Sequence, residues 1–397
     1  MKDKLESVLQ SIEPKILEIR RKIHRYPELA FQETKTAALI SSVLDEWEIE
    51  HETGIAQTGI AALVGEDNSG PVIGIRADMD ALPMQEENTH EFRSRINGCM
   101  HACGHDGHVA MGLGTAMLAK ELKSYLPGKI KFIFQPAEEG PGGAKPMIEA
   151  GVLDEPRVDY MLALHIWAAA EAGQIGVKSG SSFAAIDEFD LKIIGENSHG
   201  ASPHEGKDAV VVSSEIIQAL QNIVSRSVDP VDPAVITIGK IEGGDRRNII
   251  ADEVTMEATV RSLNKGMRDK LETRIREIVS GICQAHSVDF QLDYRNLYPP
   301  LHNDDHVTRV VNNQAEKIVG QKNVVQVSAP TMGGEDFAYF LRERPGTMFW
   351  LGGRNEEKNI DAPHHNPRFD FDEEIMPLGV KILFHSARRL MQEKKSS

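Results

Sequence analysis

The fold is decided by two apolar runs, Val72-Ile73-Gly74-Ile75-Arg76-Ala77 and Ile130-Lys131-Phe132-Ile133-Phe134-Gln135, with a helical stretch from Val109 to Tyr125 between them. Short apolar runs of this kind are typical of buried strands. Two further runs, Gly59 to Val64 and Tyr160 to Ile166, extend the series. Strands that alternate with helices form parallel sheets covered on both faces. We therefore expect an α/β domain with a mainly parallel central sheet.

A second block lies inside this domain in the sequence. A first helix is expected from about Lys4 to Arg25, and the α/β pattern continues to Gly180. From Ala185 to Tyr294 the order becomes strand, helix, strand, strand, helix, strand, which is typical of an α/β sandwich. The expected strands and helices of this block are Phe189 to Ile194, Asp208 to Ser225, Val235 to Ile241, Val254 to Arg261, Lys265 to His286 and Val288 to Tyr294.

After the inserted block the first pattern returns, with a strand at Thr347 to Leu351 and a final helix from about Glu373 to Gln392. The simplest organisation is a catalytic domain of residues 1–184 and 296–397, interrupted by a smaller domain of residues 185–295. The 397 residues are long enough for two separate cores.

Composition limits the partners and the compartment. The net charge of −16 argues against nucleic acid and against an anionic membrane, because nothing offsets phosphate repulsion. No run has the length of a transmembrane helix, and the first residues lack the apolar core of a signal peptide. The three cysteines, an odd and small number, are expected to be reduced thiols. These features together predict a cytoplasmic protein.

The segment Met100-His101-Ala102-Cys103-Gly104-His105-Asp106-Gly107-His108 contains three histidines, one cysteine and one aspartate. Imidazole and thiolate suit zinc, cobalt, nickel or ferrous iron, and a nearby carboxylate can bridge ions or orient ligands. Taken alone, the segment could be a glycine-rich loop with surface histidines. Cys99 and Cys103 could also form a redox pair, but the surrounding histidines favour metal.

Other potential ligands follow the expected strands. Asp78 and Asp80 come directly after one strand, Glu138 and Glu139 after another, and His165 at the end of a third. A late turn bracketed by prolines adds His364 and His365. Paired glutamates are usually solvated, and a histidine at a strand end is usually only hydrogen-bonded. Because sites in open α/β sheets form beyond the carboxyl ends of the strands, we expect these groups to converge on metal.

These residues resemble a known family, the dinuclear-metal amidohydrolases that include aminoacylases, hippurate hydrolases and indole-acetyl-amino-acid hydrolases, within the clan of zinc carboxypeptidases and dipeptidases. The resemblance covers nearly the whole chain. Besides the cysteine–histidine loop, the matching blocks are Arg21 to Leu29, Arg76 to Pro83, Gln135 to Gly140, Gly142 to Ala144, Ser198 to Gly206, Asn248 and Gly334 to Phe337.

The resemblance implies two divalent metal ions, with Zn, Mn, Co or Ni as candidates. The implied ligands are Cys103, His105, Glu139, His165 and His365. The adjacent His364 leaves open which histidine of the late turn is the ligand. The resemblance also implies that Glu138 is the general base and proton shuttle and that Asp80 orients the ligands from behind. Asp106 is a second candidate for such an orienting carboxylate.

The inserted domain resembles the lid and dimerisation domain of the family. His199 matches the histidine that polarises the scissile carbonyl, often from the neighbouring subunit, and Asn248 matches a residue near the substrate carboxylate. Arg247 is a further candidate there, although an arginine near a turn is usually solvated. His199 could instead simply cap a turn before the next helix.

We expect a homodimer or homotetramer, because strands such as Val254 to Arg261 could pair at an edge across a two-fold axis. The chain departs from the family where proline is common, at Ala251 and at the segment Trp167-Ala168-Ala169. The first departure bears on the lid turn and the second on the wall of the pocket. Both make the substrate preference harder to infer than the chemistry.

The expected function is hydrolysis of the amide bond of N-acyl amino acids, with N-acetyl or N-benzoyl groups among the candidates. Metal-bound hydroxide would attack the acyl carbonyl, and Glu138 would protonate the departing nitrogen. One alternative is a dipeptidase or carboxypeptidase of the same clan, which Cys103 disfavours because those relatives usually carry a bridging aspartate. The other is a metal-dependent binding protein without catalysis, which would not need Glu138 beside Glu139.

Overall fold

The structure, a computed structural model, describes residues 1–66 and 70–395, and the chain divides into two compact units. The first unit comprises Met1–Gly180, His302–Ser328 and the chain from Tyr339 onward. The second comprises Ser181–Leu301 and Ala329–Ala338. Each unit has its own hydrophobic core, and each is described by itself.

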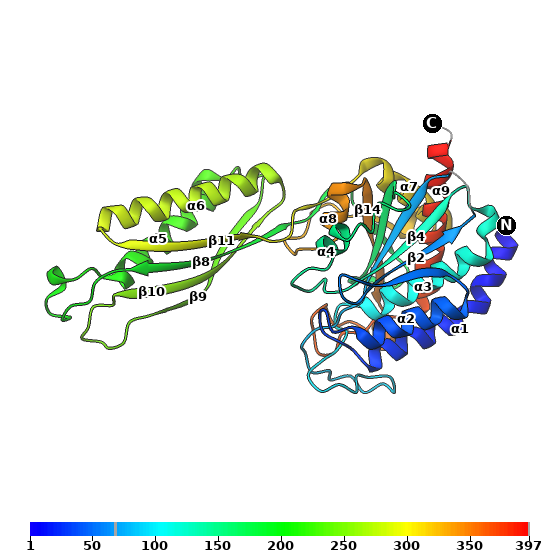
Figure 1. The fold of residues 1–397 in the computed structure, drawn as a ribbon, viewed down its shortest axis with the longest axis horizontal. Helices are drawn as coiled ribbons and strands as arrows, with labels where there is room; N and C mark the ends of the chain where they lie inside the picture. Colours follow the sequence, from blue (N-terminus) through cyan, green and yellow to red (C-terminus); the bar gives the residue numbers. More distant parts are fainter. Residues whose placement is uncertain (67–69, 396–397) are drawn as a thin grey trace. The chain divides into compact units, whose positions relative to one another are not determined.

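The first unit is built on an eight-stranded sheet in the order β1-β2-β4-β3-β5-β14-β6-β13 (Figure 1). The four central strands β4, β3, β5 and β14 are parallel to one another. The antiparallel pairs are β1 with β2, β2 with β4, and β6 with β14. The strands are β1 Glu50–Ile55, β2 Gly59–Gly65, β3 Val72–Asp78, β4 Lys129–Gln135, β5 Tyr160–Glu171, β6 Ile175–Val177, β13 Val324–Gln326 and β14 Gly346–Arg354. The expected α/β fold with a mainly parallel central sheet is confirmed.

Helices cover this sheet, and α3 lies at the centre of the packing. All of α3 except its last residues is buried. Beyond its polar first turn nearly all of its buried side chains are apolar, as expected of a helix that packs against both a sheet and other helices. It contacts strands β2 to β5, while α1 and α9 pack alongside it. The helices of this unit are α1 Lys2–Arg25, α2 Thr34–Glu46, α3 His105–Glu121, α4 Ala144–Glu149, α7 Asp305–Val319 and α9 Met376–Lys395.

Strand β5 is longer than its apolar run indicates. The run ends at Ile166, but the strand continues to Glu171 because β14 pairs with it along its length, with Trp350 opposite His165. The expectation that His165 ends its strand is therefore wrong. His165 instead lies beyond the last residue of β5 that pairs with β3, which is Ala163, so its side chain reaches the same edge as the end of β3.

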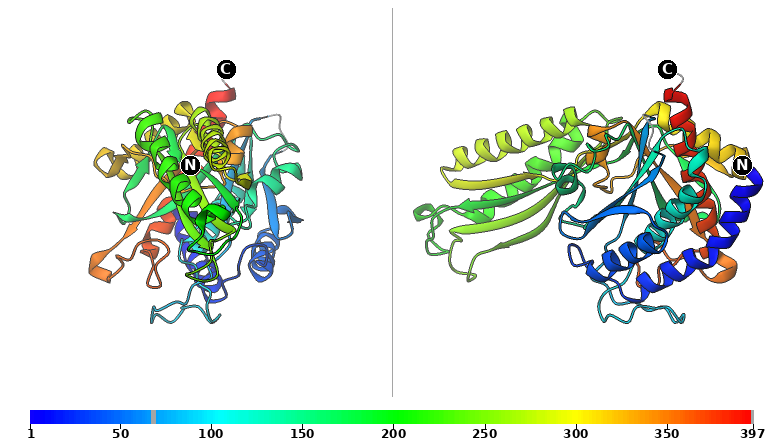
Figure 2. Two further views of the ribbon diagram at one scale, coloured as in Figure 1. Left: turned by 90° about the vertical axis from the view of Figure 1, so that its left-hand side faces the viewer. Right: turned by 45° about the vertical axis from the view of Figure 1, so that its right-hand side comes forward.

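The second unit is a four-stranded antiparallel sheet in the order β11-β8-β10-β9, with two helices on one face (Figure 2). Its elements are β8 Ala185–Ile194, α5 Ala209–Asn222, β9 Ala234–Gly243, β10 Glu253–Ser262, α6 Lys265–His286 and β11 Asp289–Asn296. The remaining short elements are the paired strands β7 Gly180–Phe183 and β12 Leu301–Asn303, and helix α8 Ala338–Glu343.

One expectation about this sheet is wrong. Val254 to Arg261 lies in β10, which is hydrogen-bonded to β8 on one side and to β9 on the other, so it is an inner strand. The edges are β9 and β11. Alternating burial is the same for an inner strand and an edge strand of a sheet with one covered face, so the local pattern could not distinguish them.

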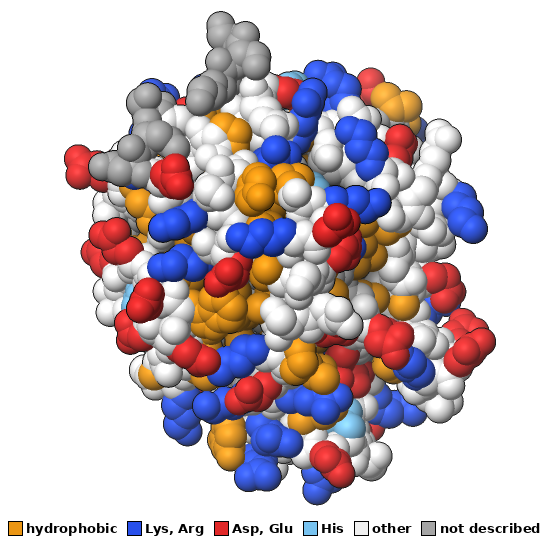
Figure 3. Space-filling model, turned by 90° about the vertical axis from the view of Figure 1, so that its right-hand side faces the viewer, with side chains coloured by type: hydrophobic (Ala, Val, Ile, Leu, Met, Phe, Trp, Pro, Cys, Tyr) orange, Lys and Arg blue, Asp and Glu red, His pale blue; other side chains and the backbone are white. Residues whose placement is uncertain are grey.

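The helices and the surface charges of the molecule can be described for the residues of the structure. Within the described residues, no helix is long and apolar enough to cross a membrane. On the face of the molecule drawn in Figure 3, Lys and Arg side chains alternate with Asp and Glu side chains and do not form a continuous basic field. This face therefore offers no extended basic surface for a polyanion.

Candidate metal centre

Two strand ends bring the acidic residues of the site together. Strands β3 and β4 are parallel and end side by side, with Asp78 opposite Gln135. The chain beyond β3 leads to Asp80, and the chain beyond β4 leads to Glu138 and Glu139. Asp80 accepts hydrogen bonds from the backbone N–H of Glu138 at 2.9 Å and of Glu139 at 3.0 Å, so it fixes the backbone that carries both glutamates.

The cysteine–histidine loop enters the same edge through a sharp turn. Gly104 adopts φ +95°, a left-handed conformation that glycine tolerates, and α3 begins at the next residue, His105. The Nδ1 atom of His105 is hydrogen-bonded to the backbone oxygen of Asp80 at 2.9 Å, which directs Nε2 the other way. This Nε2 is buried and has no hydrogen-bond partner among the described residues, as expected of a nitrogen left free for a metal ion.

The five expected ligands fall into overlapping groups of three residues. Within each group the ligand atoms lie within 4.8 Å of one another. Cys103 belongs to a group with His105 and His165, and also to a group with Glu139 and His365. Glu138 joins Glu139 and His105 in a third group. All five residues expected as metal ligands are therefore brought together in the first unit, together with the expected base, and Cys103 is common to two groups.

The donor spacing fits metal ions. The Sγ of Cys103 is 3.5 Å from Nε2 of His165, and Oε1 of Glu139 is 3.1 Å from Nε2 of His365. Ligand atoms bound at about 2.0–2.3 Å to one tetrahedral ion lie roughly 3.3–3.6 Å apart, so each pair could share an ion with little movement. Two groups that share a thiol are the arrangement expected of a two-ion site.

The two histidines of the late turn have different surroundings. His365 faces Glu139 and adopts φ +58°, a conformation that is rare for a residue other than glycine. Its backbone N–H donates to the oxygen of Ala102 at 2.8 Å, which holds the turn against the cysteine–histidine loop. His364 instead accepts a hydrogen bond from Ala168 N–H at 3.2 Å through its own Nε2. The geometry therefore favours His365 over His364 as the ligand.

The electrostatics of the cluster suit a cation. Burial and the nearby Glu139 and Glu138 carboxylates raise the pKa of the Cys103 thiol well above its usual range. Burial lowers the pKa of His105, but Asp78 and Asp80 outweigh it and raise that pKa to about 10. Nearby carboxylates thus favour the protonated forms of the thiol and the imidazole. Bound divalent ions would replace those protons as the source of positive charge in this buried site.

The other polar residues of the same loop have different surroundings, although His108 lies close enough to Asp78 and His105 to form a further possible ligand group. His108 uses both ring nitrogens, one on Oδ1 of Asp78 at 2.6 Å and the other on Ile166 N–H at 2.9 Å, and so supports the loop. Asp106, the second candidate for an orienting carboxylate, turns away from the ligands and pairs with Arg20 and His24. His101 is buried, and both of its ring nitrogens are without a hydrogen-bond partner in the described part of the chain.

A second carboxylate, which the sequence does not predict, supports the glutamate turn. Glu33 is fully buried, and its Oε1 accepts a hydrogen bond from Ala137 N–H at 3.0 Å. Glu33 and Asp80 together therefore hold three successive backbone N–H groups, at Ala137, Glu138 and Glu139. No signal in the sequence marks Glu33, because it lies in a short polar segment before α2.

Three candidate residues lie in the second unit, where two loops meet: the candidate catalytic residue His199 and the candidate substrate-binding residues Arg247 and Asn248. His199 forms an isolated bridge with Ile249, and Gly200 N–H donates to the oxygen of Asn248 at 2.8 Å. His199, Arg247 and Asn248 are all exposed. The Nδ1 of His199 accepts a hydrogen bond from Ala201 N–H at 3.1 Å, so His199 does stabilise a turn, while its Nε2 is not engaged in a described hydrogen bond.

A mainly parallel sheet with thiol, imidazole and carboxylate ligands at one edge defines a class of protein, the metal-dependent hydrolases. Comparison with known proteins gives the family. Residues 74–389 match the model of Peptidase family M20/M25/M40, and the chain belongs to this family.

Three relatives illustrate the range of the family. The chain is 40% identical over 382 residues to thermostable carboxypeptidase 1 of Saccharolobus solfataricus, covering 95% of this chain and 96% of the relative. It is 39% identical over 391 residues to N-acetyl-L-cysteine deacetylase of Bacillus subtilis, covering 98% and 91%. The crystal structure of the Bacillus subtilis YXEP protein, described as a dinuclear metal-binding peptidase, superposes with a TM-score of 0.85 at 33% identity, covering 96% and 99%.

Proposed function

We propose that this protein hydrolyses the amide bond of N-acyl amino acids with the help of two divalent metal ions. The observation that carries the proposal is the pair of ligand groups that share Cys103, set beside a glutamate, Glu138, whose backbone is fixed by Asp80. Cys103, His105, His165, Glu139 and His365 would hold the ions. When bound, the ions would polarise the acyl carbonyl and acidify a water molecule.

The proposed role of Glu138 is to move protons. Glu138 is only 7% exposed and forms a ligand group with His105 and Glu139, so it lies beside the proposed ligands. A carboxylate in this position can accept a proton from the attacking water and deliver it to the leaving amine. Glu139 pairs with His365 and adjoins Cys103, which suits a ligand and not a proton carrier. A protein that only bound metal would not need the second carboxylate.

We propose that residues of the second unit complete the substrate-binding site. The exposed imidazole of His199 would hold the developing oxyanion, and Asn248 with Arg247 would bind the substrate carboxylate. His199 would reach the metal centre of a partner subunit in a homodimer or a larger homo-oligomer. The proposal is supported by the resemblance of this unit to a lid and dimerisation domain. The three free, buried cysteines are consistent with a reducing compartment such as the cytoplasm.

The main alternative is a carboxypeptidase or dipeptidase, and a relative is named as a carboxypeptidase. Both activities break a bond between an acyl carbon and the nitrogen of an amino acid, so only the acyl side separates them. The test is to strip the protein of metal, reload it with Zn, Mn, Co or Ni, and compare N-acetyl, N-benzoyl and indole-acetyl amino acids with dipeptides and longer peptides. Metal-dependent cleavage that favours an N-acyl amino acid supports the proposal, and faster release of amino acids from peptides contradicts it.

The same assay can separate the two glutamates. Glu138→Gln keeps the shape but cannot accept a proton, so kcat should fall by about 10²–10⁴-fold while elemental analysis finds the full metal content. Glu139→Gln should lower the metal content. The opposite pattern would exchange the two roles.

A further inference from the structure

Helix α1 carries two polar residues on the row of side chains that faces the core. Ile12, Ile16, Arg20 and His24 are spaced four residues apart and therefore lie on one side of the helix. All four are buried, and the guanidinium of Arg20 is fully enclosed. Because burying a charge is costly unless it is paired, the partners of Arg20 show what this position does.

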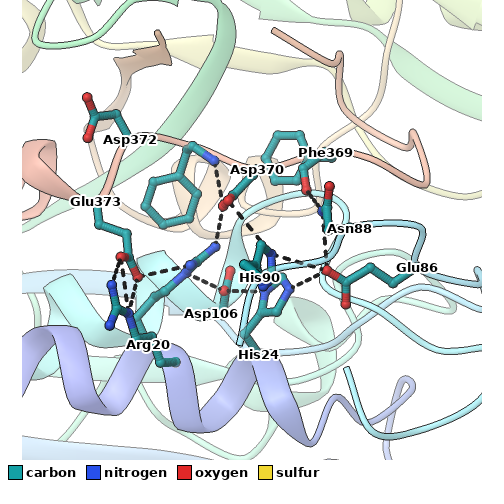
Figure 4. A network of polar contacts seen from close by, with 12 residues as sticks. Arg20, His24, Glu86, Asn88, His90, Asp106, Phe369, Asp370, Asp372 and Glu373 are labelled. Atoms are coloured by element: carbon teal, nitrogen blue, oxygen red, sulfur yellow. Dashed lines mark hydrogen bonds and ion pairs between the residues drawn. The ribbon is translucent and has the colours of Figure 1, made fainter. Parts of the chain in front are cut away.

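Each nitrogen of the Arg20 guanidinium faces a different carboxylate (Figure 4). Nε is 2.9 Å from Asp106, Nη2 is 2.6 Å from Asp370, and Nη1 is 3.0 Å from Glu373. The planar group also lies between two aromatic rings, 4.5 Å from the centroid of Phe92 and 4.6 Å from that of Phe371. Arginine can connect three carboxylates because its donors form a rigid planar fork.

The partners of Arg20 belong to the two segments that carry proposed metal ligands. Asp106 directly follows His105, and His24 holds the same carboxylate through Nδ1 at 2.8 Å. Asp370 and Glu373 lie five and eight residues after His365, in the segment between the late turn and helix α9. Through one guanidinium, helix α1 therefore connects the cysteine–histidine loop to the segment that contains His365.

A second path joins the same two segments. His24 Nε2 is hydrogen-bonded to Oε1 of Glu86 at 3.2 Å, and Asn88 donates to that oxygen at 3.2 Å and to the backbone oxygen of Phe369 at 2.9 Å. His24, Glu86 and His90 are close enough to hold a cation themselves. However, both nitrogens of His24 are already engaged, one by Asp106 and one by Glu86, so we interpret this group as part of the same network.

We propose that Arg20 is a positioning residue for the metal centre, which sets the separation between Cys103 with His105 on one segment and His365 on the other. The inference rests on the proposed metal centre and deepens it. Arg20 touches neither substrate nor metal ligand side chains and acts through Asp106 and Asp370. The ligands would consequently be held near their final spacing before any ion binds.

The neighbouring Arg21 provides a matched control. It lies on the same helix turn and pairs with Glu373 at 2.6 Å, but its side chain is 42% exposed and lines a cavity of about 410 Å³ with His90 and Phe371. It makes no described contact with Asp106. Loss of the Arg21 fork therefore removes a more exposed ion pair to the same Glu373 without disconnecting Asp106 from the late segment.

The test compares Arg20→Lys with Arg21→Lys in the full-length protein. A lysine keeps the positive charge, but one ammonium group cannot contact three carboxylates in different directions. In the metal-free protein, amide hydrogen exchange should become faster in residues 103–108 and 364–370 of Arg20→Lys and stay unchanged in Arg21→Lys. Metal affinity, measured by competition with a chelator, should fall by about 10–100-fold in Arg20→Lys alone, and the absorption spectrum of its cobalt form should change.

Unchanged exchange in both segments together with unchanged metal affinity in Arg20→Lys would overturn the inference. So would equal effects of Arg20→Lys and Arg21→Lys. If Arg20→Lys does not fold, Asp370→Asn serves instead, because Asp370 pairs with Arg20 and has no described contact with Arg21. It should speed exchange in residues 364–370 only. Wild-type protein that binds no metal would contradict the proposed centre, whereas the exchange pattern of the metal-free variants would still decide the role of Arg20.

Discussion

Cys103 is a buried residue, and burial together with the nearby carboxylates raises the pKa of its thiol. It belongs to two ligand groups, so its loss should disturb both ions. We expect Cys103→Ala to lose metal and activity together, as measured by elemental analysis and by the amide hydrolysis assay. Cys99→Ala is the control, because Cys99 directly precedes the same loop, is also buried and is not one of the proposed ligands. Full metal content in Cys103→Ala would remove this cysteine from the ligand set.

The carboxylate of Glu33 gives a prediction with a defined pH dependence. Burial raises the pKa of Glu33, and its hydrogen bond from Thr58 only partly opposes this. The folded protein thus holds the Glu33 proton more tightly than the unfolded chain, and this group's contribution to stability decreases as pH rises through the folded pKa. Glu33→Gln has no proton to lose and keeps an oxygen for Ala137 N–H.

The stability of Glu33→Gln relative to wild type should therefore increase between about pH 4 and pH 7, as measured by denaturant unfolding. Glu33→Ala, which leaves Ala137 N–H without this acceptor, should lower kcat more than Glu33→Gln at neutral pH. A stability difference that does not change with pH would show that Glu33 has an ordinary pKa in the folded protein.

At the scale of the element, helix α3 depends on glycine for close packing. A Cβ atom at Gly114 would lie 2.6 Å from Cδ1 of Ile16 on α1 and 2.9 Å from Cγ2 of Val380 on α9. Gly114→Ala should therefore destabilise this packing by about 1–3 kcal/mol. Gly281→Ala in α6 meets no atom within 4 Å and should stabilise its helix by about 1 kcal/mol. Hydrogen exchange reports each helix separately, and a stabilised α3 in Gly114→Ala would contradict the packing argument.

The elements that the sequence predicts well are those whose burial follows a simple period. The apolar runs of β2, β3 and β4 agree with the strands within one residue at each end, and helix α6 agrees at both ends. Strand β1 and helix α2 were missed. Strand β1, Glu-His-Glu-Thr-Gly-Ile, is an exposed edge strand with no apolar alternation, and its position depends on pairing with β2.

The site was predictable to the extent that its ligands lie at strand ends and in one dense loop. The residues that support these ligands could not be predicted, because carboxylate and guanidinium side chains in a sequence usually indicate solvent-exposed positions. Arg20 nevertheless carries a readable signal, since it continues the apolar row of Ile12 and Ile16. The inner position of β10 carries none, because strand order is set by contacts distant in the sequence.

At the scale of the whole molecule, the proposed dimer can be tested by complementation. The free edges β9 and β11 of the second sheet are available for pairing, and Ile241 on β9 is 52% exposed. Subunits with His199→Ala and subunits with Glu138→Gln should each be inactive. Mixing them should restore activity, because each heterodimer then contains one intact site, and turnover is compared with the unmixed variants.

Mixed dimers that form, as verified by native mass spectrometry, but remain inactive would contradict the contribution of His199 from a partner subunit. An unmixed His199→Ala protein that keeps wild-type turnover would remove His199 from the reaction altogether.

The ion pairs of Arg20 also set an order of events during synthesis. Arg20 and Asp370 are 350 residues apart, so the ribosome makes helix α1 tens of seconds before it makes the partners of that helix. His365 emerges in the same late interval. For most of translation the nascent chain therefore carries Cys103, His105, Glu139 and His165 without His365 and without the late partners of Arg20. Loading with metal then becomes a late step of maturation. A chain released before residue 365 would lack both the late carboxylate partners of Arg20 and the proposed ligand His365.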